Sequence, residues 1–363
     1  MSEESIELDT PWRRDPGEMA ARLTRWARAV VDPRATVTNV SAPGNGMSSE
    51  TVLFDVEQQN DTARFVARLA PLPEAFPVFP EYDLELQRRC MDLVRTHTDV
   101  PAPEVPYSES DPKWMGSPFI VMKRVDGTPP LDIPPYVMEG WVLDASDAER
   151  ARVQHNAVSV LARLHEITPA THDLAFLDRP EHGVPGMSQQ LGYQRWYYEW
   201  ARGDMRLPLI ERTFEWLDAR RPEEPRIVLN WGDARIGNML WRAFEPVAVL
   251  DWEMATIGPP EVDVAWMIFL HAFFQDLAAR FEMTGLPDFM DRDEICATYE
   301  ELSGHPVRDL EWYEVYAALR FAIVSIRTSG RGIAFGGEPP DDLDDLIMFR
   351  GLLEQMLAGT YWQ

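Results

Sequence analysis

The chain has 363 residues, with 60 acidic against 34 basic side chains and a formal net charge of −26. Its hydrophobic content of 45% excludes general disorder, and its length is sufficient for two lobes that each bury a core. The acidic balance argues against nucleic acid or an anionic membrane as a partner, and most of the carboxylates are expected to be solvated.

Residues 1–9 lack the basic start and the apolar core of a secretory signal. No run along the chain approaches the roughly 18 apolar residues that a membrane helix needs. Cys90 and Cys296 lie in helical patterns, without the paired spacing of a disulfide framework or a metal site. We therefore expect a soluble cytoplasmic protein with buried free thiols and no membrane partner.

A small lobe rich in strands is predicted first. Apolar positions at helical spacing predict a helix over 17–31, within an N-terminal segment 1–34. Alternating or apolar runs separated by turn residues then predict an antiparallel meander of strands over 35–40, 50–56 and 63–69, with a polar hairpin at 58–61. A helix over 82–96 and an extended segment that reaches 119–122 complete a lobe over 35–125.

Helices dominate the second lobe, which is predicted over 126–363. The capping box Ser146–Glu149 opens a helix whose inner face includes Val153 and Leu161. Further helices are predicted over 189–201, 209–219, 261–280, 292–302 and 310–328. Three short strand-like runs interrupt the helices, over 226–230, 239–241 and 246–250.

The polar residues beside these short runs carry the most chemical information. Asp233 precedes Asn238 by five residues on a loop between two predicted strands, and Asp251 follows the third run, where a side chain can point into a cleft. Phosphoryl transfer needs a carboxylate beside the attacking hydroxyl and oxygen ligands for magnesium. Asp and Asn commonly cap turns, but three such residues at this spacing favour a phosphoryl-transfer centre.

With these motifs, the chain resembles the aminoglycoside phosphotransferase-like family over about residues 35–328. The specific segments are Gly237–Leu240 and Leu250–Gly258, which are similar to a branch that includes phosphotransferase domains found with acyl-CoA dehydrogenases. The resemblance implies an α+β, two-lobe protein-kinase-like fold. Its small N-terminal lobe would contain antiparallel strands, and its larger C-terminal lobe would be mainly helical.

The resemblance also implies roles for individual residues. Asp233 would orient and deprotonate the acceptor hydroxyl, while Asn238 and Asp251 would hold Mg²⁺ on the phosphates of ATP or GTP. In the small lobe, a glycine and serine loop would lie over the phosphates, an arginine on the third strand would contact them, and a hinge segment would hold the adenine. The corresponding positions are Gly46, Ser48, Ser49, Arg68, Met122, Lys123 and Val125.

In this family, a glutamate on the next helix pairs with the basic residue of the third strand. The apolar phase of the helix over 82–96 places Gln87 at this position, while Glu85 would point about 200° around the helix. Two arrangements follow: Glu85 shifts to form the ion pair with Arg68, or Gln87 makes a neutral hydrogen bond to Arg68.

Three further residues concern the support of the loop. Trp231 occupies the position of a family histidine that supports the loop, and a buried tryptophan could replace it by packing. Asp263 matches a family aspartate, and it is interpreted as structural support or as a plain charge at a helix N-terminus. His165 at a predicted helix end is interpreted as structural and is placed outside the site.

The leading functional hypothesis is an ATP- and Mg-dependent kinase that phosphorylates a hydroxyl of a small molecule. Glu253, Asp204 and Glu199 could meet the ammonium groups of an aminoglycoside, whereas the aromatic helix around Tyr193–Trp200 suits an apolar, hydroxylated acyl metabolite, which we favour. The alternative is a nucleotide-binding pseudokinase with a regulatory or scaffold role. A protein kinase is disfavoured because no Asp-Phe-Gly motif is present. Nothing in the sequence indicates an oligomeric state.

Overall fold

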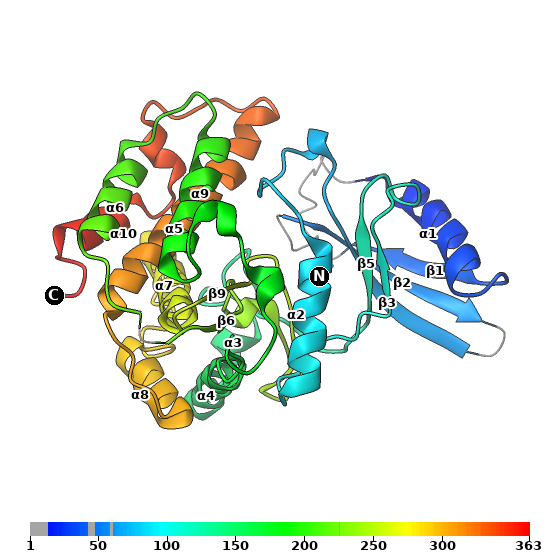
Figure 1. Cartoon of the computed structure of the whole chain (residues 1–363), viewed down its shortest axis with the longest axis horizontal. Helices are drawn as coiled ribbons and strands as arrows, with labels where there is room; N and C mark the ends of the chain where they lie inside the picture. Colours follow the sequence, from blue (N-terminus) through cyan, green and yellow to red (C-terminus); the bar gives the residue numbers. More distant parts are fainter. Residues whose placement is uncertain (1–13, 43–47, 59–60, 225) are drawn as a thin grey trace. The chain divides into compact units, whose positions relative to one another are not determined.

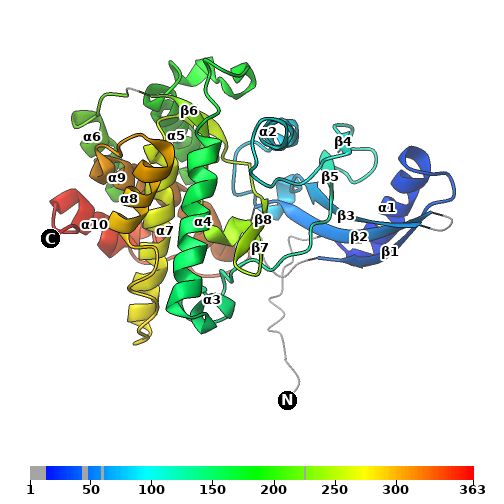
Figure 2. The ribbon, with the colours of Figure 1, turned by 90° about the horizontal axis from the view of Figure 1, so that it is seen from below.

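The computed structural model describes residues 14–42, 48–58, 61–224 and 226–363 (Figures 1 and 2). The chain divides into two compact units. The first combines residues 1–78 with 106–124, and the second combines 79–105 with 125–363. A five-stranded antiparallel sheet in the first unit and a mainly helical second unit confirm the predicted α+β, kinase-like fold class.

The first unit is built on a sheet with strand order β1-β2-β3-β5-β4, in which every neighbouring pair is antiparallel. Its elements are α1 (Pro16–Val30), β1 (Thr36–Ser41), β2 (Glu50–Gln58), β3 (Asp61–Leu69), β4 (Tyr107–Glu109) and β5 (Phe119–Lys123). The predicted meander is thus confirmed, while β4 was not predicted. The predicted hairpin turn includes residues 59–60, which lie outside the described residues.

Helix α1 packs its apolar stripe on this sheet (Figure 2). The fully buried Trp26 meets Phe54 and Phe119 edge-on, with ring centroids 6.2 and 5.7 Å apart. Its indole Nε1 donates a hydrogen bond to Glu109 at 2.9 Å. Aromatic burial with a satisfied polar atom therefore fixes this helix on the sheet.

The second unit contains most of the helices. Its helices are α2 (Leu84–His97), α3 (Trp141–Asp144), α4 (Asp147–Leu164), α5 (Met187–Arg202), α6 (Pro208–Ala219), α7 (Glu261–Arg280), α8 (Arg292–Ser303), α9 (Leu310–Ala334) and α10 (Arg350–Ala358). The predicted helices are all present, with small shifts at their ends except at the C-terminal end of α9. The capping box of Ser146 and Glu149 is formed at the start of α4. Helices α3 and α10 were not predicted.

Helix α9 is central because it packs against α5, α6, α7 and α10. Helix α7 is apolar around most of its circumference, as expected of a helix surrounded by protein. It is the one helix of the described residues that is long and apolar enough to cross a membrane, yet 72% of its apolar window is buried inside the protein. We interpret it as a core helix.

Four short strands lie among the helices of the second unit. They are β6 (Val228–Asn230), β7 (Met239–Arg242), β8 (Glu245–Val249) and β9 (Thr256–Gly258). Strand β6 pairs with β9 and β7 pairs with β8, both antiparallel. The first three strands were predicted and β9 was not. Short 3-10 helices complete the chain, at Pro73–Ala75, Ala175–Leu177, Pro180–His182, Ile236–Asn238 and Leu343–Leu346.

The two cysteines are free, as predicted. Cys90 on α2 is fully buried, and burial raises its pKa well above the ordinary range of a thiol. Cys296 on α8 is partly exposed, and burial likewise raises its pKa, to about 12. Both side chains are therefore neutral thiols at physiological pH.

Candidate active site

The loop between β6 and β7 contains two of the three predicted catalytic and metal-binding residues, Asp233 and Asn238, and the third, Asp251, follows β8. The amide Nδ2 of Asn238 donates to Oδ2 of Asp233 at 2.6 Å. The backbone N–H of Leu250 donates to the carbonyl of Asn238 at 2.9 Å, which holds the neighbouring Asp251 beside the loop. Asp251 has a φ of +61°. Asp adopts this left-handed conformation more readily than most other non-glycine residues.

Two more side chains fix the Asp233 carboxylate. The indole Nε1 of Trp266 on α7 donates to its Oδ1 at 2.7 Å, and Nε of Arg235 donates to the same oxygen at 3.2 Å. The Asp233 side chain is 16% exposed, so the carboxylate is oriented but remains accessible. An oriented, accessible carboxylate can accept a proton from a hydroxyl placed beside it.

Arg235 was not identified from the sequence. Its guanidinium bridges two carboxylates, donating to Asp132 at 2.6 Å as well as to Asp233. Burial lowers the pKa of Arg235, but the adjacent carboxylates of Asp233 and Asp132 raise it more, so its net pKa lies above the ordinary arginine value. A permanent positive charge therefore lies directly beside the candidate base.

Gly232 is required by the backbone geometry of the loop. Its φ is +93°, and a Cβ at this position would lie 2.0 Å from the carbonyl oxygen of Met254. Its carbonyl accepts a hydrogen bond from Nη2 of Arg320 on α9 at 2.9 Å. A side chain would therefore separate the loop from the segment that follows Asp251.

Asp263 on α7 holds the loop from the other side. Its fully buried carboxylate accepts from the backbone N–H of Trp231 at 2.7 Å and of Gly232 at 2.9 Å. His165 lies 3.1 Å from this carboxylate through Nε2, and its Nδ1 lies 2.8 Å from the hydroxyl of Tyr299. Structural support is thus the correct interpretation of Asp263, and the plain helix charge is wrong. His165 also has a structural role.

Trp231 supports the loop by more than packing. Its side chain is fully buried, with its ring centroid 6.1 Å from that of Trp252. Its indole Nε1 donates to the carbonyl of Leu250 at 2.8 Å. Because Leu250 precedes Asp251, this hydrogen bond ties the catalytic loop to the second predicted metal ligand.

We expect Trp231→Phe to lower the free energy of unfolding by about 1–2 kcal/mol, because the Leu250 carbonyl loses its partner in a buried site. Urea unfolding measures the change. The control is Trp216→Phe, since Trp216 on α6 is only partly buried. The control change should stay within about 0.5 kcal/mol. Equal effects at both positions would refute a specific role for the Trp231 hydrogen bond.

The donor atoms at the loop fit a magnesium ion. Mg²⁺ prefers oxygen ligands and usually takes one or two protein carboxylates together with substrate phosphates. Since Nδ2 of Asn238 donates to Asp233, the amide oxygen of Asn238 is directed away from that carboxylate. Within residues 14–42, 48–58, 61–224 and 226–363, no cluster of three His, Cys, Asp or Glu side chains forms a metal cage. An Asn and Asp pair of this kind suits a metal bound with a nucleotide.

The predicted nucleotide-binding residues fall in both units. Gly46 lies outside the described residues. Ser48 and Ser49 are the two residues before β2, which begins at Glu50. Arg68 lies on β3, opposite Thr51 on one side and Ile120 on the other. In β5, Met122 is buried and pairs with Val66, and Lys123 is exposed. Val125 begins the second segment of the other unit.

Helix α2 has the phase that was predicted from its apolar residues. Gln87 is 1% exposed, whereas the Glu85 side chain is 53% exposed and pairs with Arg88. Glu85 therefore points to the solvent side of the helix.

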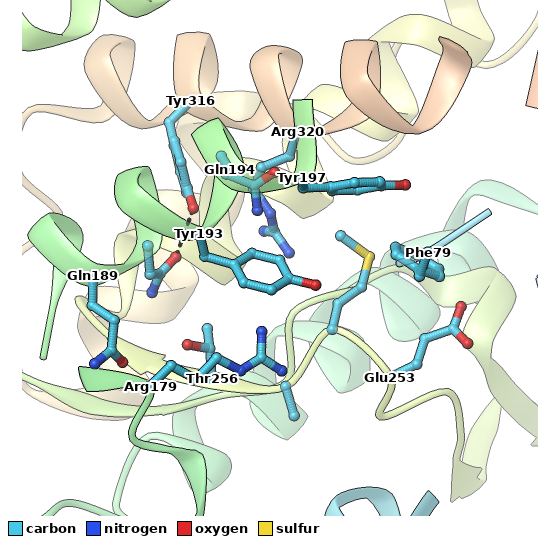
Figure 3. A pocket seen from close by; sticks show the side chains of 13 residues that line it. Phe79, Arg179, Gln189, Tyr193, Gln194, Tyr197, Glu253, Thr256, Tyr316 and Arg320 are labelled. Carbon is cyan, nitrogen blue, oxygen red and sulfur yellow. Dashed lines mark hydrogen bonds between the residues drawn. The ribbon is translucent and has the colours of Figure 1, made fainter. Parts of the chain in front are cut away.

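A pocket within the second unit (Figure 3) is connected to the loop through Arg320, which lines the pocket and donates to the Gly232 carbonyl. It is lined by residues of α5, by the segment Glu253–Thr256 that follows Asp251, and by Tyr316 and Arg320 of α9. Of the three acidic residues considered for ammonium binding, only Glu253 lines this pocket. Glu199 is exposed and paired with Arg202, and Asp204 is exposed.

The pocket walls contain two tyrosines from the predicted aromatic helix, Tyr193 and Tyr197. Burial raises the pKa of both phenols, so they stay neutral hydroxyl groups at pH 7. Such groups combine an apolar surface with a hydrogen-bonding tip. The pocket therefore suits a small molecule with both apolar and polar parts.

Known proteins of similar sequence include acyl-CoA dehydrogenases. The probable acyl-CoA dehydrogenase IBR3 of Arabidopsis thaliana is 26% identical over 306 residues, which cover 80% of this chain and 35% of the relative. Acyl-CoA dehydrogenase family member 10 of Mus musculus is 27% identical over 228 residues, covering 60% of this chain and 20% of the relative. The chain thus spans about a third or less of the length of these relatives.

Solved structures share the fold at low sequence identity. A Ralstonia eutropha JMP134 protein, provisionally assigned as an aminoglycoside phosphotransferase, has a TM-score of 0.65 at 22% identity, covering 94% of this chain and 98% of that one. Plasmodium vivax ethanolamine kinase has a TM-score of 0.62 at 12% identity, covering 96% and 91%. A thermostable APH(4)-Ia mutant, bound to AMP-PNP and hygromycin B, has a TM-score of 0.54 at 14% identity, covering 93% and 97%.

The family of this chain is assigned by a family model. The distant solved structures show only that the fold is shared. The family model matches residues 39–304, which include the loop between β6 and β7, Asp251 and Asp263. The matched range is most of the chain. The chain therefore belongs to the phosphotransferase enzyme family.

Proposed function

We propose that this protein is an ATP- and Mg-dependent kinase that phosphorylates a hydroxyl of a small molecule. The observation that carries the proposal is the arrangement of the loop, in which Asn238 donates to the Asp233 carboxylate at 2.6 Å and accepts from Leu250 through its backbone. The proposed base and the two proposed oxygen ligands, Asn238 and Asp251, are thereby held close together, with Asp251 following β8.

In the proposed reaction, Asp233 accepts the proton of the acceptor hydroxyl as the hydroxyl oxygen bonds to the γ-phosphorus. The bond from this phosphorus to the bridging oxygen breaks, and ADP leaves. Magnesium bound by Asn238 and Asp251 would neutralise phosphate charge. Arg235 and Trp266 orient the Asp233 carboxylate by donating to its Oδ1, and Asn238 donates to its Oδ2.

We assign nucleotide binding to the lobe over 35–125 and acceptor binding to the lobe over 126–363. The AMP-PNP complex of a protein with this fold supports an adenine nucleotide, with GTP as the competing donor. Within the first lobe, the proposed contacts are the residues predicted from the sequence: Gly46, Ser48, Ser49, Arg68, Met122 and Lys123, with Val125 at the boundary. Backbone N–H groups, hydroxyls and a guanidinium all suit phosphate oxygens.

For the acceptor, a metabolite is favoured over an antibiotic. The sequence relatives are acyl-CoA dehydrogenases, which supports a hydroxylated acyl compound. The pocket shown in Figure 3 offers Tyr193 and Tyr197 as walls, and Glu253 is its single acidic residue. A polycationic aminoglycoside would find little compensating charge there.

An ATP-consumption screen tests this proposal. The full chain is incubated with Mg-ATP or Mg-GTP and with aminoglycosides, hydroxyacyl-CoAs, hydroxy acids, amino alcohols and sugars, and phosphorylated products are identified by mass spectrometry. We expect turnover with one acceptor class and loss of turnover in Asp233→Asn. Binding of Mg-ATP without transfer to any acceptor, unchanged by Asp233→Asn, would instead support the pseudokinase alternative.

A further inference from the structure

Arg320 has an unusual environment in the pocket shown in Figure 3. The residue is 2% exposed, and its guanidinium lies 4.4 Å above the centre of the Trp266 ring. One nitrogen, Nη2, donates to the Gly232 carbonyl. The other, Nη1, is buried and has no hydrogen-bond partner among the described residues. A buried, charged donor without a partner is costly, so a ligand atom is expected to complete its environment.

A second arginine reaches the same pocket. The guanidinium of Arg179 lies 4.3 Å from the centre of the Tyr193 ring, and in Figure 3 Arg320 and Arg179 lie on opposite sides of Tyr193. Glu253, the acidic residue of the pocket, lies away from Arg320 in Figure 3. The end of the pocket near Tyr193 therefore carries positive charge on both sides.

The whole pocket is small, with a volume of about 40 Å³. Because each water needs about 10–15 Å³ by this measure, the space corresponds to about three waters. A carboxylate matches it better than a bulkier phosphate monoester, whose second negative charge Glu253 would also disfavour.

Trp266 connects this end of the pocket to the reaction. One face of its indole carries the Arg320 guanidinium, and its Nε1 donates to Asp233 at 2.7 Å. Arg320 also binds the residue that immediately precedes Asp233. A group bound at Nη1 would thus be separated from the candidate base by little more than one indole ring.

We infer that the acceptor is a short hydroxy acid whose free carboxylate pairs with Nη1 of Arg320, while its hydroxyl faces Asp233. The inference rests on the proposed kinase function and adds the substrate class. Arg179 attracts the carboxylate at longer range, and its guanidinium fixes the position of the Tyr193 ring. Amino sugars and amino alcohols are disfavoured because their ammonium groups would lie beside two guanidinium groups.

Matched acceptors test the inference. The probes are 2-, 3- and 4-hydroxybutyrate, their primary amides, ethanolamine and glycerol 3-phosphate, each with Mg-ATP. Hydrogen bonds to charged groups contribute about 1.5–3 kcal/mol, so the best acid should exceed its amide by about 10–100-fold in kcat/KM. Equal use of acid and amide, or a preference for ethanolamine, would overturn the inference and leave the kinase proposal intact. A preference for glycerol 3-phosphate would overturn the carboxylate assignment.

The variants separate recognition from support of the loop. Arg320→Gln should raise the KM of the acid more than tenfold and bring the ratio of acid to amide close to one, a ratio that a purely structural defect would not change. Arg179→Gln, which spares the contact with Gly232, should reduce the same ratio less. The matched control is Arg327→Gln on the same helix, whose guanidinium lies over Trp200 and not in the pocket. An unchanged ratio in Arg320→Gln would refute the inference.

Binding without turnover gives an independent test. Calorimetry with butyrate, which has no hydroxyl, should detect binding to the wild-type chain, and no binding of butyramide. Arg320→Gln should abolish the butyrate signal, and Arg320→Lys should retain part of it. Failure of butyrate to bind would overturn the inference even when a hydroxyl compound is phosphorylated. Butyrate binding without turnover of any acceptor would support this site and contradict the kinase function.

Discussion

Asp233→Asn is expected to lower kcat by about 10²–10⁴-fold, the usual contribution of a positioned general base. The amide is nearly the same size as the carboxylate and can still accept a hydrogen bond from Trp266 or Asn238. It cannot take up a proton at neutral pH. The measurement is kcat for the acceptor found in the screen, at saturating Mg-ATP, together with the melting temperature of both proteins.

The matched control is Asp204→Asn, because Asp204 is exposed and lies outside the pocket. It should leave kcat and KM within twofold of the wild type. Should Asp233→Asn retain more than a tenth of the wild-type kcat while folding normally, the assignment of Asp233 as the base would be wrong. A tenfold rise in KM alone would indicate that Asp233 only positions the acceptor.

Local patterns in the sequence predicted the part of the candidate site whose residues lie close together along the chain. The spacing of Asp233, Asn238 and Asp251 predicted that the three lie together, because the loop and its flanking strands are contiguous in sequence. Their hydrogen bonds, from Asn238 to Asp233 and from Leu250 to Asn238, join residues that are at most 12 positions apart. A short loop between strands leaves few alternative arrangements for such residues.

Apart from Arg235, which lies in the loop itself, the residues that were missed come from distant elements. Trp266 on α7 and Arg320 on α9 contact the loop from 33 and 88 positions away. Within its own helix, Trp266 resembles an ordinary core residue and Arg320 resembles a surface charge. Arg320 has no acidic neighbour one turn away. Only the packing of α7 against α9 directs both side chains to Asp233 and Gly232.

The C-terminal end of α9 shows how packing overrides a local signal. The sequence predicted an end at residue 328, before Ser329 and Gly330, which disfavour a helix interior. The helix instead continues to Ala334. Ser329 Oγ donates to the carbonyl of Leu346 at 3.0 Å, and Gly330 is buried against its neighbours. These tertiary contacts offset the weak local propensity of the two residues.

Asp263→Asn should have the largest effect on stability, lowering the free energy of unfolding by about 3 kcal/mol. The carboxylate accepts from the N–H groups of Trp231 and Gly232 through different oxygens. An amide has one acceptor oxygen, so one buried N–H would face an NH₂ group and lose its partner, at about 1–3 kcal/mol, with more lost because the original acceptor is charged. Urea unfolding measures this change.

The same substitution should lower kcat by about 10²-fold, because the backbone that precedes Asp233 loses its anchor and a displacement near 1 Å has that effect. Asp293→Asn is the matched control, since Asp293 is exposed in the first turn of α8, where its charge interacts with the helix N-terminus and, at 3.8 Å, with the Arg292 guanidinium. That interaction contributes about 0.3–1 kcal/mol. Equal losses in the two variants would restore the helix-charge interpretation of Asp263. A loss of stability with normal kcat would show that Asp263 supports the fold without positioning the base.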